Sequence, residues 1–403
     1  MKHKLTIVVF SVILALLFLV NMLATVAGAY FAYQGAAPSD KMKTTAASVI
    51  RSVNKADILK YPFVELNSMF QLAIGKNTVE DPQPTYTVVR MENDYLTFVY
   101  PEYDTDFYAQ DLIDFNDELS DKNIPMLFVQ VPIKNDKYNE NLLPYGIDDC
   151  SNINADKLVC KLTDNGVETL DLRDALHNEK EDITSKFFRT DHHWLPETAF
   201  DVYSYICTKL NNEYDFEIPD EYYSENSFDF DVTEDYVLGH IGNRVGVMYS
   251  GGTEDITVIK PKFPTYYQFN LMTDEKGKFQ PSTKKGSYEN TILDTNKLNQ
   301  PIVYSRIGYH TYIGGDYGEL RITNESAPVD KRILLVRDSF AAPFAAFLST
   351  AVKNLDVVDL RYFGEGFTLS NHVTVTKPDM VIFFMSPHMY EEAYTQALDF
   401  YEN

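Results

Sequence analysis

Apolar positions along the chain follow two alternating patterns. From Tyr108 to Leu119 they recur at helical spacing, and from Ile124 to Pro132 they form one short continuous run. A short apolar run after a helix is typical of a strand that is buried on both faces of a parallel sheet. The same alternation continues toward the end of the chain, with further strands expected at 167–172, 332–337, 355–362 and 380–385, and further helices at 196–210, 340–352 and 390–401.

Strands that alternate with helices of this size predict a three-layer α/β/α fold, in which right-handed crossovers connect a central parallel sheet. Between about 215 and 330 the pattern changes to short alternating and aromatic pieces, separated by glycine, asparagine and aspartate. We expect this segment to be an insertion rich in β-structure and loops. The α/β/α domain is expected to span 85–403, after a stalk or N-terminal extension at 35–84 that ends in a proline-containing breaker.

The N-terminal segment has a pattern of its own. Lys2 and Lys4 precede an uncharged apolar stretch from Leu5 to about Tyr33, and about 20 apolar residues suffice for a helix to cross the bilayer core. Basic residues on the short flank favour a cytoplasmic N-terminus, so the rest of the chain is expected outside the membrane. We expect residues 1–34 to be a transmembrane anchor, and small residues before position 30 leave a cleaved signal peptide open as the alternative.

Composition narrows the class of protein. The 403 residues include 59 Asp and Glu against 35 Lys and Arg, a net charge of −24, and 45% of them are hydrophobic. A core of that size excludes a disordered chain, and the acidic balance argues against a nucleic-acid partner, because phosphate neutralisation requires clustered Lys and Arg. Three cysteines cannot form a disulfide framework, although Cys150 and Cys160 are close enough in sequence to close one small loop, and Cys207 falls in an apolar helical pattern.

The only tryptophan lies in a candidate active-site segment, Asp191-His192-His193-Trp194. Pro196 fixes the start of the following helix, so these residues occupy the connecting loop, where active-site residues are common. Because residues two apart in an extended segment project to the same side, we expect Asp191 and His193 to face one site while His192 points elsewhere. A carboxylate beside an imidazole fixes the tautomer of the imidazole and stabilises the imidazolium, as a general base requires.

A second candidate is the serine that follows the strand expected at 332–337. Asp338 and Ser339 come directly after that strand and lead into an apolar helix. A serine at the carboxyl end of a buried strand lies in the crevice where open α/β sheets place their ligands, and amides at the helix start can stabilise an oxyanion. The alternative is that Ser339 or Asp338 only caps the helix. A serine needs a base to react at neutral pH, and the loop with His193 supplies one.

Other roles for the histidines stay open. A zinc site at the adjacent pair would need a third ligand, and neither His240 nor His310 belongs to a metal-binding helix pattern. The pair could instead be structural, hydrogen-bonded under the tryptophan ring. His388 follows the last predicted strand and is a rival base for Ser339. We expect neither a metal nor a cofactor.

The string Asp191-His192-His193-Trp194 resembles the signature of the DHHW protein family. Together with Asp338-Ser339 it is similar to the wider group of SGNH-hydrolase-like proteins that includes the alginate O-acetyltransferases, which carry an Asp-x-His-Trp segment upstream of a serine that follows a later strand. The resemblance covers about residues 85–400, and the Lys377-Pro378-Asp379 step before the final strand supports it. At the second position of the motif this chain has His192, where the alginate proteins commonly have threonine.

The resemblance implies an SGNH-hydrolase-like domain in which Ser339 is the nucleophile, His193 is the base and Asp191 orients the histidine. It also implies a glycan acceptor and an acetyl donor that a multipass membrane acyltransferase delivers. The order Asp-x-His before Ser agrees with the alginate-type group and disfavours His388 as the base. The candidates for substrate or oxyanion contacts are Asp338, Trp194, His192, Lys134 after the first strand, and Asn243 and Arg244 in the stretch 239–244, for which a β-turn is the alternative.

We therefore expect a membrane-anchored cell-surface enzyme that acetylates a polysaccharide of the cell envelope through an acetyl-serine intermediate. One alternative is a carbohydrate esterase of the same fold, which differs only in using water as the acceptor. The other is a non-catalytic surface protein that binds glycan. Because an acidic surface repels strongly anionic polymers, a neutral or weakly charged glycan is favoured.

Overall fold

The computed structural model describes residues 57–80, 87–138, 142–273, 278–362 and 367–390, together with isolated positions at 19, 22, 26, 30 and 33. The chain divides into two compact units, residues 1–75 and 76–403. The predicted anchor at 1–34, apart from those isolated positions, and the predicted closing helix beyond Tyr390 lie outside the described residues. Among the helices that are described, none combines the length and the apolar character that a membrane crossing requires.

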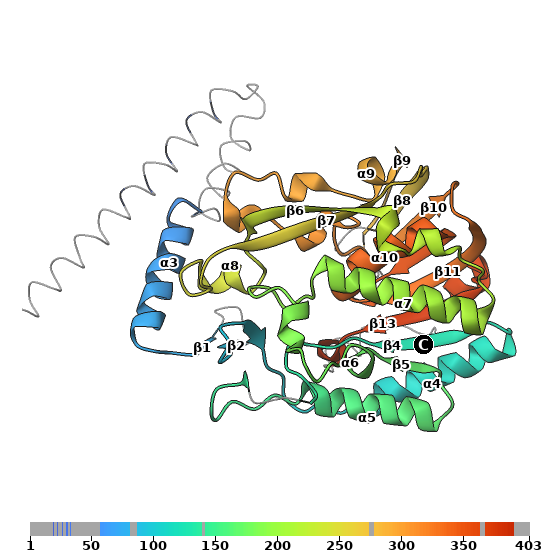
Figure 1. Ribbon diagram of the computed structural model, residues 1–403, viewed down its shortest axis with the longest axis horizontal. Helices are drawn as coiled ribbons and strands as arrows, with labels where there is room; N and C mark the ends of the chain where they lie inside the picture. Colours follow the sequence, from blue (N-terminus) through green and yellow to red (C-terminus); the bar gives the residue numbers. More distant parts are fainter. Residues whose placement is uncertain are drawn as a thin grey trace, which may run out of the picture. The chain divides into compact units, whose positions relative to one another are not determined.

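The second unit is organised around one large mixed sheet (Figure 1). Within the described residues, five of its strands pair in parallel, and three further strands continue the sheet antiparallel beyond the fifth. In spatial order the strands are β5 (Thr169–Asp171), β4 (Met126–Gln130), β13 (Met380–Met385), β11 (Val329–Arg337), β12 (Val352–Val358), β10 (Glu319–Asn324), β8 (Tyr267–Thr273) and β9 (Phe279–Gly286).

The parallel strands are those that the continuous apolar runs predict, and every residue of β4 and β13 is buried. The expectation of an entirely parallel central sheet is wrong, because the segment predicted as an insertion contributes β8, β9 and β10 to the same sheet. In β8 and β10 buried residues alternate with partly exposed ones, which is typical of an antiparallel sheet with one open face. That local pattern predicts strands but does not reveal their partners.

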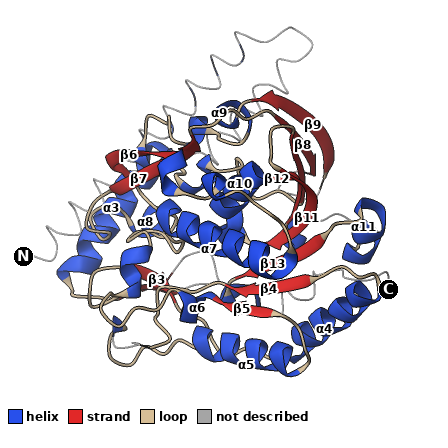
Figure 2. Ribbon diagram, turned by 45° about the vertical axis from the view of Figure 1, so that its right-hand side comes forward, coloured by secondary structure: helices blue, strands red, loops and turns tan. Residues whose placement is uncertain are grey.

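Helices cover both faces of the parallel strands (Figures 1 and 2). On one face lie α7 (Pro196–Tyr214) and α10 (Ala342–Ala351), and on the other α4 (Asp106–Asp121), α5 (Ser151–Asp164) and α11 (Leu369–Thr376). Alternate residues of β11 show this division, since Ile333 and Leu335 pack in the cluster of α7 and α10, whereas Leu334 and Val336 pack in that of α4, α5 and α11. The predicted α/β/α layering is confirmed.

Strand β11 lies where the order of the strands reverses. The chain leaves β11 through α10 to reach β12 on one side, and then passes through α11 to β13 on the other side of β11. Because α10 and α11 cover opposite faces, the connections diverge at the carboxyl end of β11 and leave a crevice there. Ser339 follows this strand after a single residue, Asp338.

Smaller elements complete the two units. In the second unit, β1 (Thr78–Glu80), β2 (Thr87–Arg90) and β3 (Leu96–Phe98) form one antiparallel sheet, and β6 (Phe228–Val237) pairs with β7 (Glu254–Pro261) in another. Phe228 of β6 packs against Phe200 of α7 with ring centroids 4.8 Å apart. The short helices α6 (Leu172–Ala175), α8 (Gly242–Val245) and α9 (Tyr288–Thr291) also belong to this unit, and α3 (Asp57–Ala73) belongs to the first.

The cysteines all lie in described residues and are free thiols. Cys150 immediately precedes α5 and Cys160 lies inside it. At a rise of 1.5 Å per residue, about 15 Å of helix separates them, which is more than twice the Cα separation that a disulfide allows. The small disulfide loop that their spacing suggested is therefore excluded, and Cys207 is buried in α7, as predicted.

Candidate active site

Ser339 occupies the first position of a short 3-10 helix, η8 (Ser339–Ala341), which continues into α10. The cap of this helix is Asp338, whose Oδ1 accepts a hydrogen bond from the N–H of Phe340 at 2.9 Å. The neighbouring residue therefore performs the capping, and the Ser339 hydroxyl group is not engaged in it. The Ser339 side chain is largely buried and lies against His193 instead.

Ser339, His193 and Asp191 form a hydrogen-bonded row, which we call the catalytic row. Nε2 of His193 lies 2.8 Å from Oγ of Ser339, and Nδ1 of His193 lies 2.8 Å from Oδ1 of Asp191. The serine and the histidine are 146 residues apart in the sequence, so the fold and not local geometry brings them together. With Nδ1 protonated toward the carboxylate, Nε2 carries the lone pair that can take the serine proton.

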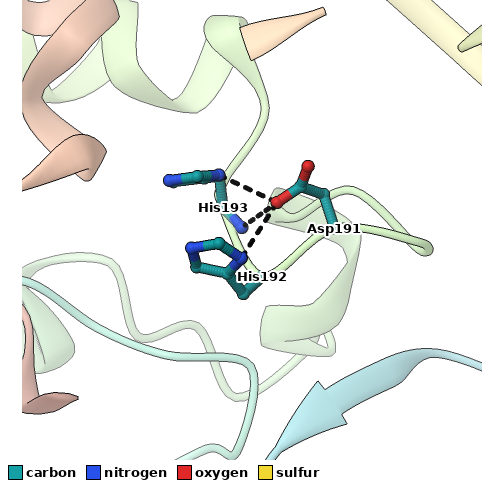
Figure 3. A group of neighbouring side chains, drawn as sticks. All are labelled: Asp191, His192 and His193. Carbon is teal, nitrogen blue, oxygen red and sulfur yellow. Dashed lines mark hydrogen bonds and ion pairs between the residues drawn. The ribbon is translucent and has the colours of Figure 1, made fainter. Parts of the chain in front are cut away.

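His192 lies at the same carboxylate (Figure 3). Its Nδ1 is 3.2 Å from Oδ1 of Asp191, and the ring centroids of His192 and His193 are 3.8 Å apart. The expectation that His192 points elsewhere is wrong, because the segment is not extended at this point. The N–H of His193 donates to Oδ1 of Asp191 at 3.2 Å, and this turn around the aspartate brings three successive side chains to one side.

The loop that carries Asp191 is held from two directions. Glu254, at the start of β7, accepts hydrogen bonds from the N–H of Arg189 at 2.6 Å and from both the N–H and the hydroxyl group of Thr190. From the other side, the N–H of His240 donates to Oδ2 of Asp191 at 2.7 Å. Both carboxylate oxygens of Asp191 are thus fixed, one toward His193 and one toward the backbone.

Trp194 and Tyr309 support the catalytic row from the protein interior. Trp194 is fully buried, and its indole N–H donates to the Tyr309 hydroxyl group at 3.0 Å and to the carbonyl oxygen of Phe340 at 3.1 Å. The Tyr309 ring stacks on His193 with centroids 3.8 Å apart, and its hydroxyl group donates to the same Phe340 carbonyl at 2.5 Å. Trp194 therefore positions the site and does not contact substrate, contrary to its place among the predicted substrate candidates.

Burial and neighbouring charges set the ionisation of the catalytic row. Burial lowers the pKa of His193 to about 3, and the charge of His192 acts in the same direction. Burial alone would raise the pKa of Asp191, but its interactions with His193 and His192 hold that pKa well below the usual range. At neutral pH the carboxylate is therefore ionised and the imidazole neutral, which is the protonation state that a general base needs.

The catalytic row opens on a cavity of about 450 Å³. Of the predicted substrate candidates, His192, Asn243 and Arg244 line this cavity. Arg244 also donates through Nη2 to Nε2 of His240 at 2.7 Å. Aromatic and charged side chains form much of the remaining wall, a mixture suited to a polar ligand with apolar ring faces, and among them are Phe98, Tyr304, Arg306, Asp316, Arg361 and His388.

Lys134 and Asp338 do not line this cavity, so the prediction that they contact substrate there is corrected. Lys134 is buried, and its ammonium group donates to the carbonyl oxygens of Leu96 at 2.5 Å and Arg189 at 3.2 Å. Burial lowers the pKa of Lys134 to about 7. The two hydrogen bonds of Lys134 connect β3 to the loop of Asp191. Asp338 is fully buried and caps the short helix that begins at Ser339. Both residues stabilise the site without lining its cavity.

A metal ion at this site would compete with the catalytic row. Within the described parts of the chain, Asp191, His192 and His193 each place a potential donor atom within 4.8 Å of the others. Nδ1 of each histidine already lies against the same oxygen of Asp191 (Figure 3). A cation between them would displace the proton that joins His193 to Asp191, so the arrangement fits proton transfer better than metal binding.

Some residues at the site have no recognisable sequence signal. Tyr309 and Glu254 lie in irregular or β-rich segments, and they meet the catalytic loop across 115 and 65 residues of sequence respectively. The stretch 239–244, by contrast, contains two of the candidates that the sequence predicts for substrate or oxyanion contacts. His388, the rival base, hydrogen-bonds through Nδ1 to Ser386 at 2.5 Å, whereas Ser339 is bonded to His193.

Part of the chain matches a known family model. Residues 101–228 match the family model described as the SGNH hydrolase-like domain of the acetyltransferase AlgX. The matched range contains the Asp191–Trp194 loop and ends before Ser339. No curated protein matches the chain.

Similar solved structures extend the comparison to most of the chain. Bacillus cereus PatB1 has a TM-score of 0.61 and 18% sequence identity, over 77% of this chain and 99% of that one. A DHHW family protein from Eubacterium siraeum has a TM-score of 0.55 and 16% identity, over 79% of this chain and 97% of that one. The chain therefore has an SGNH hydrolase-like α/β fold with a mixed sheet, and the resemblance to SGNH-like and DHHW proteins that its sequence predicts is confirmed.

Proposed function

We propose that the chain is an O-acetyltransferase that moves an acetyl group onto a polysaccharide of the cell envelope through acetyl-Ser339. The observation that carries this proposal is the catalytic row, with 2.8 Å between Ser339 Oγ and His193 Nε2 and 2.8 Å between His193 Nδ1 and Asp191 Oδ1. A serine beside a neutral, oriented base is competent for acyl transfer. The match of residues 101–228 to an acetyltransferase family model supports acetyl as the transferred group.

In the first half-reaction, Nε2 of His193 takes the proton of Ser339 as Oγ bonds to the carbonyl carbon of the acetyl donor. The backbone N–H of Ser339, at the start of a helical segment, and the amide group of Asn243 are the candidate donors to the resulting oxyanion. When the intermediate collapses, the bond to the leaving group breaks and His193 gives the proton to it. Asp191 stabilises the imidazolium between these steps.

In the second half-reaction, a sugar hydroxyl group gives its proton to His193 and attacks the carbonyl carbon of acetyl-Ser339. Ser339 Oγ then leaves and recovers that proton. Water in place of the sugar would make the protein an esterase, so the two activities share every residue of the catalytic row. Tyr304 on the cavity wall is partly exposed and offers an aromatic ring against which a sugar can pack, which supports a carbohydrate acceptor.

We further propose that the enzyme works outside the cytoplasmic membrane. The uncharged stretch from Leu5 to about Tyr33, after two lysines, supports an N-terminal anchor with the remainder of the chain on the outer side. An enzyme in that position has no access to acetyl donors in the cytoplasm. A multipass membrane acyltransferase would therefore bring the acetyl group across, and the glycan acceptor would be met at the cell surface.

Acetylation of Ser339 tests the proposal directly. The full chain is incubated with p-nitrophenyl acetate, and p-nitrophenol release and intact-protein mass are followed. We expect the wild-type protein to gain one acetyl group on Ser339. Ser339→Ala and His193→Ala are each expected to slow nitrophenol release by at least about 10³-fold, because nucleophile and base act as a unit. Ser370→Ala, in α11, is the matched serine control and should keep the wild-type rate.

Adding a neutral oligosaccharide separates the related functions. An acetylated oligosaccharide as product identifies a transferase, and free acetate as the only product identifies an esterase. Turnover by Ser339→Ala at the wild-type rate would contradict the serine mechanism. Binding of oligosaccharide without any acetylation of the wild-type protein would instead establish a non-catalytic glycan-binding protein.

A further inference from the structure

A second hydrogen-bonded row begins beside the nucleophile. Oδ2 of Asp338 accepts hydrogen bonds from the N–H of Ser386 at 2.8 Å and from its hydroxyl group at 2.5 Å. Oγ of Ser386 lies in turn 2.5 Å from Nδ1 of His388. Asp338 and Ser386 are fully buried, whereas His388 is 9% exposed and lines the same cavity as Ser339. The mechanism proposed above uses none of these hydrogen bonds.

The protons available in this second row determine which group donates and which accepts in each hydrogen bond. Burial raises the pKa of Asp338, but hydrogen bonds from Ser386 and from the N–H of Phe340 oppose that rise. The hydroxyl group of Ser386 donates to Oδ2 of Asp338, so its single proton is directed toward that carboxylate. Oγ of Ser386 then accepts the proton on Nδ1 of His388, and the other ring nitrogen, Nε2, carries a lone pair.

His388 is held in this neutral state at the cavity wall. Burial lowers the pKa of His388 well below its usual range, and the positive charge of Arg361 acts in the same direction. The next turn of chain is also fixed, because the hydroxyl group of Tyr390 donates to Oε1 of Gln130 at 2.6 Å. A neutral imidazole whose Nε2 is an acceptor pairs with an O–H or N–H group and not with an anion.

His388 lies close to residues that surround the nucleophile, where the acceptor would bind. Its ring centroid is 6.4 Å from that of Phe340, the residue after the nucleophile, and 6.4 Å from that of His192. His192 in turn lies 3.8 Å from His193, by ring centroids. Both rows therefore reach the wall of the same cavity, with His192 close to each, so one polyhydroxyl ligand can contact both.

We propose that Asp338, Ser386 and His388 form an acceptor-binding subsite, in which Nε2 of His388 accepts a hydrogen bond from a hydroxyl group of the acceptor sugar. This inference rests on the proposed function. The hydroxyl group that binds His388 is a neighbour of the one that attacks acetyl-Ser339, so the contact orients the attacking group. Ser386 and Asp338 are positioning residues, because they act by holding the tautomer of His388.

Two replacements of His388 in the full chain test the subsite. His388→Asn keeps a short amide that can donate to Ser386 but places nothing at the former Nε2 position, whereas His388→Gln places an amide group there. The donor is p-nitrophenyl acetate and the acceptor is methyl β-glucopyranoside. The measured quantity is the ratio of acetylated glucoside to free acetate as the glucoside concentration rises.

We expect His388→Asn to lower this ratio about tenfold through a higher KM for the glucoside, which corresponds to one hydrogen bond between uncharged groups. His388→Gln is expected to recover part of the loss. Ser386→Ala is also expected to lower this ratio. Without the Ser386 hydroxyl group, His388 is no longer held in the tautomer that carries its proton on Nδ1. A merely structural role would lower the unfolding temperature and the acylation rate without a selective rise in this KM.

His372→Asn is the matched control, since His372 is another buried histidine, placed between Glu319 and Asp356 and absent from the cavity wall. It should keep the wild-type ratio. A wild-type ratio in His388→Asn, or no transfer to the glucoside by the wild-type protein, overturns the subsite. Absence of acetyl-Ser339 from the wild-type protein overturns the proposed function instead, so the two failures are distinguishable by mass spectrometry.

Discussion

His193 works at a position where its charged form is unfavourable. Its ring lies between Tyr309 and His192, with both centroid distances at 3.8 Å, and little water can reach it to solvate a positive charge. Protonation there depends on the carboxylate of Asp191. At neutral pH the protein therefore holds a neutral imidazole at this position, and in the proposed mechanism an imidazolium exists only during proton transfer.

The low pKa of His193 predicts an unusual pH profile for acylation by p-nitrophenyl acetate. The base is active when neutral, and its pKa is lowered to about 3, so the rate should stay level from pH 7.5 down to pH 5. A histidine of ordinary pKa would lose about thirtyfold in rate over that range.

Circular dichroism at each pH is the control. The same lowered pKa makes the unfolded chain bind a proton that the folded chain does not, so stability falls as the pH drops below about 6.5. A rate that falls through pH 6.5 while the fold is intact would contradict the prediction.

The Asp191 loop depends on its neighbours for its shape. The N–H of Gly239 donates to Oγ1 of Thr190 at 2.8 Å, and the N–H of Gly242 donates to the carbonyl oxygen of Thr190 at 2.8 Å. A Cβ atom on Gly239 would lie 2.5 Å from Cβ of Asp191 and 2.6 Å from its backbone nitrogen. Only glycine allows this approach without a shift of the loop.

Gly239→Ala is therefore expected to displace Asp191 and to slow acylation by about 10²-fold, the effect of a misplacement of about 1 Å at an active site. Gly166→Ala is the control, because Gly166 has φ +77° and open space around its Cβ position. It should destabilise the fold by about 1 kcal/mol without slowing acylation. Urea unfolding and the acylation rate separate the two effects, and a wild-type rate in Gly239→Ala would refute the close-packing argument.

The elements that the sequence predicts well are those with an uninterrupted apolar signal. Strands such as β4 and β13 are buried on both faces, so their runs carry the information locally. Helix α5 gave no such signal, because its buried face includes Ser151, Asn152 and Asn154. The pairing of β10 with β12 depends on contacts between distant segments, as do the contacts of Tyr309 with the catalytic row, and a local pattern cannot encode them.

The charge of the whole molecule contrasts with that of its cavity. The net charge is −24, yet Arg244, Arg306 and Arg361 line the cavity. Of the carboxylates there, Asp191 is engaged with the histidines and Asp316 with Arg337. An anionic ligand is therefore repelled at long range and tolerated near the catalytic row.

This contrast predicts a salt effect that depends on the acceptor. For an anionic oligosaccharide, kcat/KM should rise about two- to tenfold between 10 mM and 500 mM salt, because added ions screen the long-range repulsion. For a neutral glucoside it should stay constant, and this acceptor is the control. A fall with salt for the anionic acceptor would mean that the arginines of the cavity outweigh the net charge.

The contacts of Trp194 have an optical consequence. The indole N–H donates to the carbonyl oxygen of Phe340, which directly follows the residue that would carry the acetyl group, and the chain contains no other tryptophan. Any shift of that carbonyl during a catalytic cycle changes the surroundings of the one indole. The native fluorescence of the protein is therefore expected to report formation of the proposed acyl-enzyme without an attached label.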